Sequence, residues 1–226
     1  MDITRLAFVT GTQAGKWFRR FQDTTAHGGL FTIDADDSMA ELLSGNVDVA
    51  LMRLPDGRVD DSFHVVRLYE ETPGIAVPKD SVYAEVGEAL ALADVSDEHL
   101  NYQLTDSGEV DIAAVREALQ VVAANVGIAI APLPLLKILS KKQVVPLALT
   151  GSEVPVTEIA LVWRKSHDNE AIQDFVGIAK GRTARSSRQE KPKRTAREKA
   201  KTKQSRRIVN NPLQKPKKRP KQRKRR

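Results

Sequence analysis

Short apolar runs alternate with amphipathic segments through the first fifty residues of the chain. Three of the runs have the length of buried strands, and they cover residues 5–9, 30–33 and 47–52. Between them, residues 13–24 carry Trp17, Phe18 and Phe21 at helical spacing, and residues 39–44 read as a shorter helix. This β–α–β–α–β order predicts right-handed crossovers and a parallel sheet with helices on its faces.

The first two helices have recognisable start signals in the sequence. Thr12 stands where a hydroxyl would cap the first helix, and Ser38 with Glu41 three residues later forms a capping-box pattern for the second. Further along, Asn125 and Gly127 end a helical pattern, and asparagine tolerates the left-handed conformation of such an end.

The rest of the chain as far as residue 180 continues the α/β pattern without an internal repeat. The predicted strands cover residues 65–68, 72–78, 128–131, 144–148 and 158–163, with weaker signals at 88–93 and 97–100. The predicted helices cover residues 110–124, 135–140 and 167–179. We expect Trp17 and Trp163 to belong to the core.

Charge divides the chain into two parts of opposite sign. Residues 181–226 hold 21 Lys and Arg against two Glu, whereas residues 1–180 hold 15 basic and 27 acidic residues. The formal net charge of +7 therefore combines a basic tail of about +19 with an acidic body of about −12. The tail has no aromatic residue and few large apolar ones, so we expect it to be disordered when free.

Two roles for the basic tail stay open. A flexible cationic arm contacts phosphates and reads no bases, so binding to nucleic acid would be independent of sequence. The alternative is association of the tail with the acidic body. The cationic residues predicted to contact nucleic acid are Lys193, Arg194, Arg197, Arg206, Arg207, Lys217, Lys218, Arg219, Arg223, Lys224 and Arg225.

Several functional classes lack support in the sequence. The chain has no cysteine and only four scattered histidines, which argues against disulfides, thiolate chemistry and a metal site. Neither a phosphate-binding loop nor a nucleophile elbow is present. No apolar run is long enough for a membrane span or a signal peptide. We therefore expect a cytoplasmic protein that is not an enzyme and that needs no cofactor.

Five segments in order resemble the effector-binding domain of LysR-type transcriptional regulators, which has the type 2 periplasmic-binding-protein fold. They are residues 6–22 (LAFVTGTQAGKWFRRFQ), 39–55 (MAELLSGNVDVALMRLP), 68–80 (LYEETPGIAVPKD), 119–132 (LQVVAANVGIAIAP) and 158–165 (EIALVWRK). The sequence differs from the family pattern in four ways, and the first is the basic tail, which is not a general feature of the family. It starts at the first strand of such a domain, so we expect the helix-turn-helix module to be absent. The second lobe is shortened between residues 99 and 110, and Asn125 replaces a glycine.

The resemblance implies a two-lobed α/β domain over residues 1–180, followed by the basic tail over 181–226. Its first lobe would comprise residues 1–73 and 150–180, and its second lobe residues 78–146. It further implies pairing of two copies through the first lobe, and thus a homodimer.

The cleft between such lobes would hold a small effector at the carboxyl ends of the strands. The predicted ligand-binding residues are Thr10, Gly11, Thr12, Arg53, Thr105 and Pro132. A helix N-terminus and a guanidinium favour a carboxylate as the ligand. The structural alternative is that Thr12 is only a cap and that Arg53 pairs with Asp48, Asp56 or Asp60 on the surface.

The sequence thus favours a stand-alone effector-binding domain linked to transcription regulation. Two alternatives remain, namely a tail-driven nucleic-acid binder whose body is a dimerisation module, and an intracellular solute-binding protein.

Overall fold

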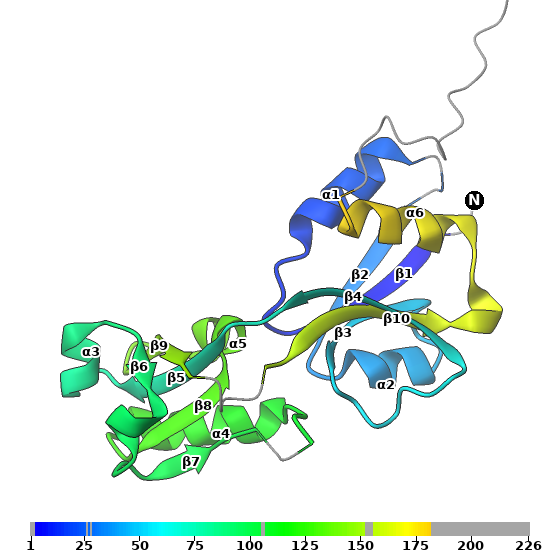
Figure 1. The fold of residues 1–226 in the computed structure, drawn as a ribbon. Helices are drawn as coiled ribbons and strands as arrows, with labels where there is room; N and C mark the ends of the chain where they lie inside the picture. Colours follow the sequence, from blue (N-terminus) through cyan, green and yellow to red (C-terminus); the bar gives the residue numbers. More distant parts are fainter. Residues whose placement is uncertain (1–2, 26, 28, 105–106, 152–155, 182–226) are drawn as a thin grey trace, which may run out of the picture. The chain divides into compact units, whose positions relative to one another are not determined.

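The computed structural model describes residues 3–25, 27, 29–104, 107–151 and 156–181. The described residues form two five-stranded sheets with helices packed against them (Figure 1). The predicted disorder of the tail and its predicted nucleic-acid contacts lie outside the described residues.

The first sheet has the strand order β2-β1-β3-β10-β4. Strand β1 pairs in parallel with β2 and β3, and β10 pairs antiparallel with β3 and β4, so the predicted β–α–β–α–β unit is confirmed. The elements of this lobe are β1 (Thr4–Val9), α1 (Gly15–Thr24), β2 (Leu30–Ala35), α2 (Ser38–Leu43), β3 (Val49–Leu54), β4 (Phe63–Glu70), β10 (Glu158–Arg164) and α6 (Glu170–Ala179).

The second sheet has the order β6-β9-β5-β8-β7. Its middle strand β5 pairs antiparallel with both β8 and β9. The elements are β5 (Pro73–Pro78), α3 (Val82–Val86), β6 (Leu90–Ala91), β7 (Leu100–Tyr102), α4 (Ile112–Ala123), β8 (Ile128–Pro132), α5 (Leu133–Leu139) and β9 (Val144–Thr150), and a 3₁₀ turn covers Leu92–Val95. The short helix α3 was not predicted.

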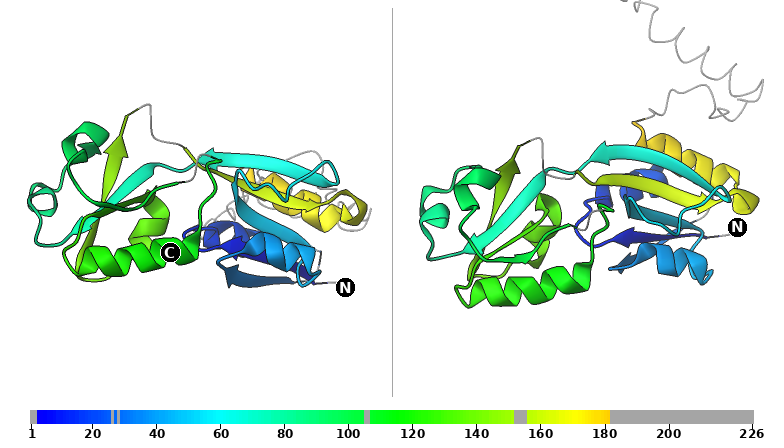
Figure 2. Two further views of the ribbon diagram at one scale, coloured as in Figure 1. Left: turned by 90° about the horizontal axis from the view of Figure 1, so that it is seen from below. Right: turned by 60° about the horizontal axis from the view of Figure 1, so that its bottom comes forward.

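Alternating side chains of the first sheet fill two separate cores. Leu6 and Leu161 point to the side covered by α1 and α6, where Phe21, Phe175 and Trp163 are buried. On the opposite side, α2 covers a smaller core of residues that includes Ala7, Met39, Leu42, Ala160 and Val162. Figure 2 shows these helices on opposite faces of the sheet. Trp163 is therefore a core residue as predicted, whereas Trp17 is only partly buried against the core.

Two predicted helix caps are wrong. The hydroxyl of Thr12 donates to the Val9 carbonyl at 2.8 Å, and α1 begins later, after Ala14, without a side-chain cap. The cap of α2 is Asp37, whose carboxylate accepts from the Ala40 amide at 2.9 Å. Ser38 is buried one residue further on and donates to the Leu51 carbonyl, since the aspartate before it already occupies the cap position.

Asn125 adopts the predicted left-handed conformation, with φ of 66°. The chain passes from the first sheet to the second between Glu70 and Pro73, and it returns between Thr150 and Glu158. These two connections are joined by a hydrogen bond from the Glu71 amide to the Thr157 carbonyl at 2.8 Å. Within the part of the chain that the structure describes, no helix has the length and apolar character to cross a membrane.

Candidate ligand-binding site

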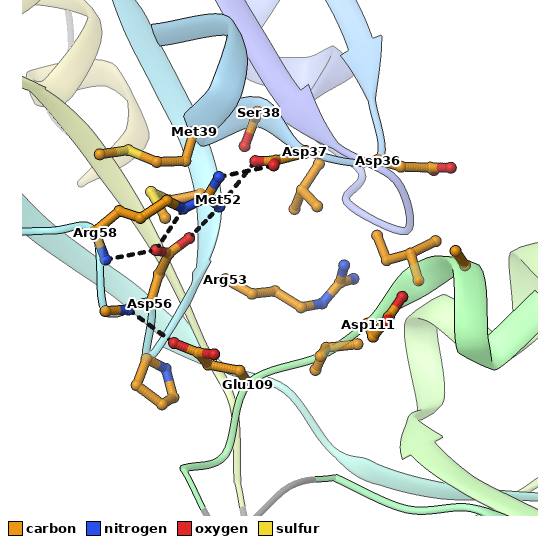
Figure 3. Close-up of a pocket in the computed structure, with 16 residues that line it drawn as sticks. Asp36, Asp37, Ser38, Met39, Met52, Arg53, Asp56, Arg58, Glu109 and Asp111 are labelled. Atoms are coloured by element: carbon orange, nitrogen blue, oxygen red, sulfur yellow. Dashed lines mark hydrogen bonds and ion pairs between the residues drawn. The ribbon is translucent and has the colours of Figure 1, made fainter. Parts of the chain in front are cut away.

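A cavity of about 520 Å³ lies at the carboxyl ends of β1 and β3 (Figure 3). One wall comes from Val9, from the loop that leads into α2, and from the turn after β3. The facing wall is the segment 109–113, which ends in the first turn of α4 and therefore belongs to the other lobe. The cavity is thus bounded by both lobes, where open α/β sheets bind their ligands.

The lining of the cavity is acidic. Five carboxylates line it against two guanidinium groups. The carboxylates are those of Asp36, Asp37, Asp56, Glu109 and Asp111, and the guanidinium groups are those of Arg53 and Arg58. An anionic ligand would meet an unfavourable potential unless a guanidinium group were free to bind it.

Arg58 is engaged by two of these carboxylates. Its Nη1 atom lies 2.7 Å from Asp37 Oδ2, and its Nη2 atom lies 2.6 Å from Asp56 Oδ2. The hydrogen bond from Arg58 is the main reason why the pKa of Asp37 is lowered from 3.8, against the opposing effect of partial burial. Hydrogen bonds to Asp56 and Asp37 in turn raise the pKa of Arg58.

Arg53 is buried and forms a paired network with Glu71, which we call the hinge network. Arg53 Nε and Nη2 donate to the two oxygens of Glu71 at 2.7 and 3.1 Å, and Nη1 donates to the Thr10 carbonyl at 2.8 Å. The Thr157 hydroxyl completes the network by donating to Glu71 at 2.9 Å. Sequence reasoning suggested a surface pairing with Asp48, Asp56 or Asp60, whereas the structure gives Arg53 a buried partner in the connection between the sheets.

The predicted anion cradle at Thr10–Thr12 is occupied by internal hydrogen bonds. The amide of Thr10 donates to Ala35 and the amide of Thr12 to Val9. The Thr10 hydroxyl lies within donating distance of two carboxylate oxygens, at 3.0 Å from Asp34 Oδ1 and at 2.7 Å from Asp36 Oδ1. The region therefore presents fewer free donors than a helix N-terminus directly after a strand would.

The remaining predicted site residues lie apart from the cavity lining or cannot be placed. Pro132 is buried at the end of β8, where it pairs with Pro73 and borders a narrow void beside Glu71. Thr105 lies outside the described residues. Sequence reasoning named Arg53 but missed Arg58, Glu109 and Asp111. The available signal was their position in the loop after a strand or in the loop before a helix.

Comparisons with known proteins bear on the fold. The family model of the LysR substrate binding domain matches residues 107–184. No match to a curated protein sequence was found.

Solved structures with this architecture include three LysR-type proteins. Full-length CbnR in complex with its target DNA has a TM-score of 0.60 at 17% identity, covering 81% of this chain and 71% of CbnR. The BenM effector binding domain with its effector benzoate has a TM-score of 0.59 at 16% identity, covering 84% of this chain and 96% of that one. The OxyR regulatory domain from Pseudomonas aeruginosa has a TM-score of 0.55 at 13% identity, covering 80% and 97%.

The described residues therefore have the two-lobed α/β fold of LysR effector-binding domains, of the type 2 periplasmic-binding-protein kind. Residues 107–184 carry the sequence pattern of the LysR substrate binding domain. The predicted fold class and the predicted family resemblance are both confirmed.

Proposed function

We propose that the body of this protein is an effector-binding domain that takes a small molecule into the cavity between its lobes and serves transcription regulation. The observation that carries the proposal is the position of the 520 Å³ cavity at the carboxyl ends of β1 and β3, bounded by both lobes. The likeness to the benzoate-bound BenM domain supports it. The proposed role is binding rather than catalysis, and no cofactor is part of it.

The ligand that fits this cavity best is neutral or cationic. Five carboxylates line the cavity, and both of its guanidinium groups are already paired with Asp or Glu. The carboxylate site expected at Thr10, Gly11, Thr12 and Arg53 stays a prediction, and the internal hydrogen bonds of these residues weigh against it.

A thermal-shift and calorimetry screen tests the proposal with benzoate, other aromatic carboxylates, neutral polyols and small amines. We expect the melting temperature to rise with a member of the neutral or cationic group. Ala113→Phe fills the cavity from its α4 wall and should abolish that rise. Ala123→Phe, an equally large change at the exposed far end of the same helix, should leave it intact. A carboxylate that binds with undiminished affinity in Ala113→Phe would contradict both the site and the ligand class.

We also propose that residues 181–226 bind nucleic acid through phosphate contacts and without sequence preference. The supporting observation is their composition of 21 basic and two acidic residues. Gel shifts with unrelated duplexes should show similar affinities, and log K should fall by about 0.9 per neutralised phosphate for each tenfold rise in salt. Truncation after Lys180 should abolish the shift. Retention of binding in the truncated protein, or a strong preference for one operator, would contradict this role of the tail.

A homodimer stays part of the proposal, because the described residues include the whole first sheet with its exposed edge strand β2. Light scattering on residues 1–180 should give twice the monomer mass at micromolar concentration. A monomer at every concentration would contradict the proposed homodimer.

A further inference from the structure

The outer face of α1 is basic, although the body as a whole is acidic. Lys16, Arg19 and Arg20 stand three and four residues apart, so they share the side of the helix that points away from the core, where Phe21 is buried. Asp23 is the only acidic residue of α1. The helix thus carries three basic residues and one acidic residue, in a body that holds 15 basic and 27 acidic residues.

This arrangement of charges disfavours the helix itself. Like charges three and four residues apart on one helix face repel one another. Lys16 also lies in the first turn, where the helix dipole disfavours a positive charge, and α1 has neither an acidic residue in that turn nor a side-chain cap. Local choices that work against the fold are expected at functional sites, and a partner rich in negative charge would offset these.

The charges of Lys16 and Arg19 are not used by the fold. Most arginines of the described body pair with a carboxylate, as Arg67 does with Glu158 at 2.6 Å. Within the part of the chain that the structure describes, neither Lys16 nor Arg19 has a salt bridge, and both residues are exposed. Both charges are therefore accessible to an anionic partner.

The chain leaves the body beside this face. Helix α6 packs against α1 on the same side of the first sheet (Figure 1), and the ring of Phe175 contacts those of Phe18 and Phe21, with centroids 6.1 and 5.7 Å apart. Lys180 follows Phe175 by five residues, which is about 7.5 Å of helix rise. The basic sequence of residues 181–226 therefore begins close to α1.

We propose that Lys16 and Arg19 extend the nucleic-acid contacts of the tail, so that a duplex bound by the tail also lies against the outer face of α1. This inference rests on the proposed binding of nucleic acid by residues 181–226. The two residues are separated by about 4.5 Å of helix rise, which is close to the spacing of about 3.4 Å between phosphates of one strand along the duplex axis. Repulsion by the acidic remainder of the body favours the same orientation, with α1 toward the duplex.

Fluorescence anisotropy on the full chain with a labelled duplex of arbitrary sequence, measured over a series of salt concentrations, tests the proposal. Lys16→Gln with Arg19→Gln removes two positive charges from the outer face of α1. Lys141→Gln with Lys142→Gln is the matched control, because it removes two exposed positive charges from the segment between α5 and β9 in the other lobe.

We expect the slope of log K against log salt to become less steep by about 1.8 in the α1 variant, since each lost phosphate contact removes about 0.9. The control pair should keep the slope of the parent. Equal slopes in the parent and the α1 variant would overturn this inference and leave the role of the tail intact. A parent chain that binds no duplex would overturn both.

The position of the duplex can be measured separately, because the chain has no cysteine. A photoactivated crosslinker on Gln22→Cys, an exposed position of α1, should capture the duplex several times more efficiently than the same group on Gln120→Cys, an exposed position of α4. Equal capture at the two positions would overturn the proposal.

Light scattering distinguishes this role from pairing of two copies of the chain. The molecular mass of the α1 variant should equal that of the parent. A halved mass together with the change in slope would overturn the proposal, because the face would then join two copies and the loss of the dimer would account for the weaker binding.

Discussion

The two sets of charged contacts around the cavity use the same chemistry in opposite surroundings. In the hinge network, the side chains of Arg53 and Glu71 are 6% and 1% exposed, and both oxygens of the carboxylate are bonded. In the second set, Arg116 on α4 lies 2.9 Å from Asp36 in the loop before α2, and both side chains are about half exposed. An ion pair out of water is costly to break because one charge is left unpaired, whereas an exposed pair exchanges its partner for solvent. The comparison indicates that the hinge network stabilises the fold more than the exposed pair does.

Removal of Glu71 should have the largest effect. Glu71→Ala leaves the buried guanidinium of Arg53 without its carboxylate, and the loss of one partner of a buried pair costs roughly 3–5 kcal/mol. Urea unfolding of residues 1–180 at pH 7 measures the change. Glu70→Ala changes the exposed neighbour of Glu71 at the end of β4 and should cost less than about 0.5 kcal/mol. Equal effects of the two variants would show that the hinge network does not hold the connection.

Gly11→Ala should disturb the same network by sterics. Gly11 has a φ of 98°, and an added Cβ would lie 2.7 Å from Arg53 Nη2 and 3.0 Å from the backbone of Leu135. We expect a loss of roughly 1–3 kcal/mol in the free energy of unfolding.

The matched control is Gly45→Ala. Gly45 also has a positive φ, of 77°, but an added Cβ meets nothing within 4 Å. The free energy of unfolding that Gly11→Ala loses beyond the loss in Gly45→Ala measures the clash of the added Cβ with Arg53 and Leu135. No excess would mean that Arg53 has room to move and that the hinge network is loosely packed.

Acid should weaken the contact of Asp37 with Arg58. The pKa of Asp37 is lowered in the folded state, so its contribution to stability is present above the unfolded value of 3.8 and is lost as the pH falls through the folded pKa. Arg58→Gln should therefore destabilise by up to about 1 kcal/mol at pH 7, because the groups are partly exposed, and by less at pH 2.5. Unfolding curves of both proteins at the two pH values give the difference. A destabilisation that grows in acid would contradict the assigned cause of the shift.

The smallest effect should come from the exposed pair of Arg116 with Asp36. Arg116→Gln and Asp36→Asn should each change the free energy of unfolding by less than about 1 kcal/mol. Their coupling in a double-mutant cycle should be about 0.2–1 kcal/mol at low salt and should shrink at high salt. A coupling above 2 kcal/mol would show that this exposed pair is as strong as the hinge network and would remove the contrast between them.

The strands were predictable from the sequence because their signal is local. The apolar runs at β3, β8 and β10 each lie within a residue or two of the expected bounds, and the left-handed Asn125 follows from its own chemistry. The helix caps were harder to predict, since Asp37 and Ser38 compete for one position and burial of Ser38 decides between them. The short helix α3 has no buried residue, so its sequence lacks the apolar periodicity that would predict a helix.

The site could be predicted only in outline. The carboxyl ends of the strands indicated the region, but the partner of Arg53 lies 18 positions away in a connection between sheets. Charge pairing across lobes depends on tertiary geometry, and no spacing rule links Glu109 to Gly57 or Arg116 to Asp36. Sequence reasoning therefore assigned the guanidinium group of Arg53 to a ligand. In the folded protein that group is paired with the carboxylate of Glu71.

Amide hydrogen exchange tests the contrast between the buried hinge network and the exposed contacts at the cavity most directly. The amides of Glu71 and Gly57 each make a hydrogen bond of 2.8 Å, the first to the Thr157 carbonyl and the second to Glu109. The account predicts that the Glu71 amide exchanges only through global unfolding, whereas the Gly57 amide exchanges through a far less costly local opening. Glu109→Ala should speed exchange at Gly57 and leave Glu71 unchanged. Equal protection of both amides, or acceleration of both by Glu109→Ala, would contradict the contrast between a strong buried network and weak exposed contacts.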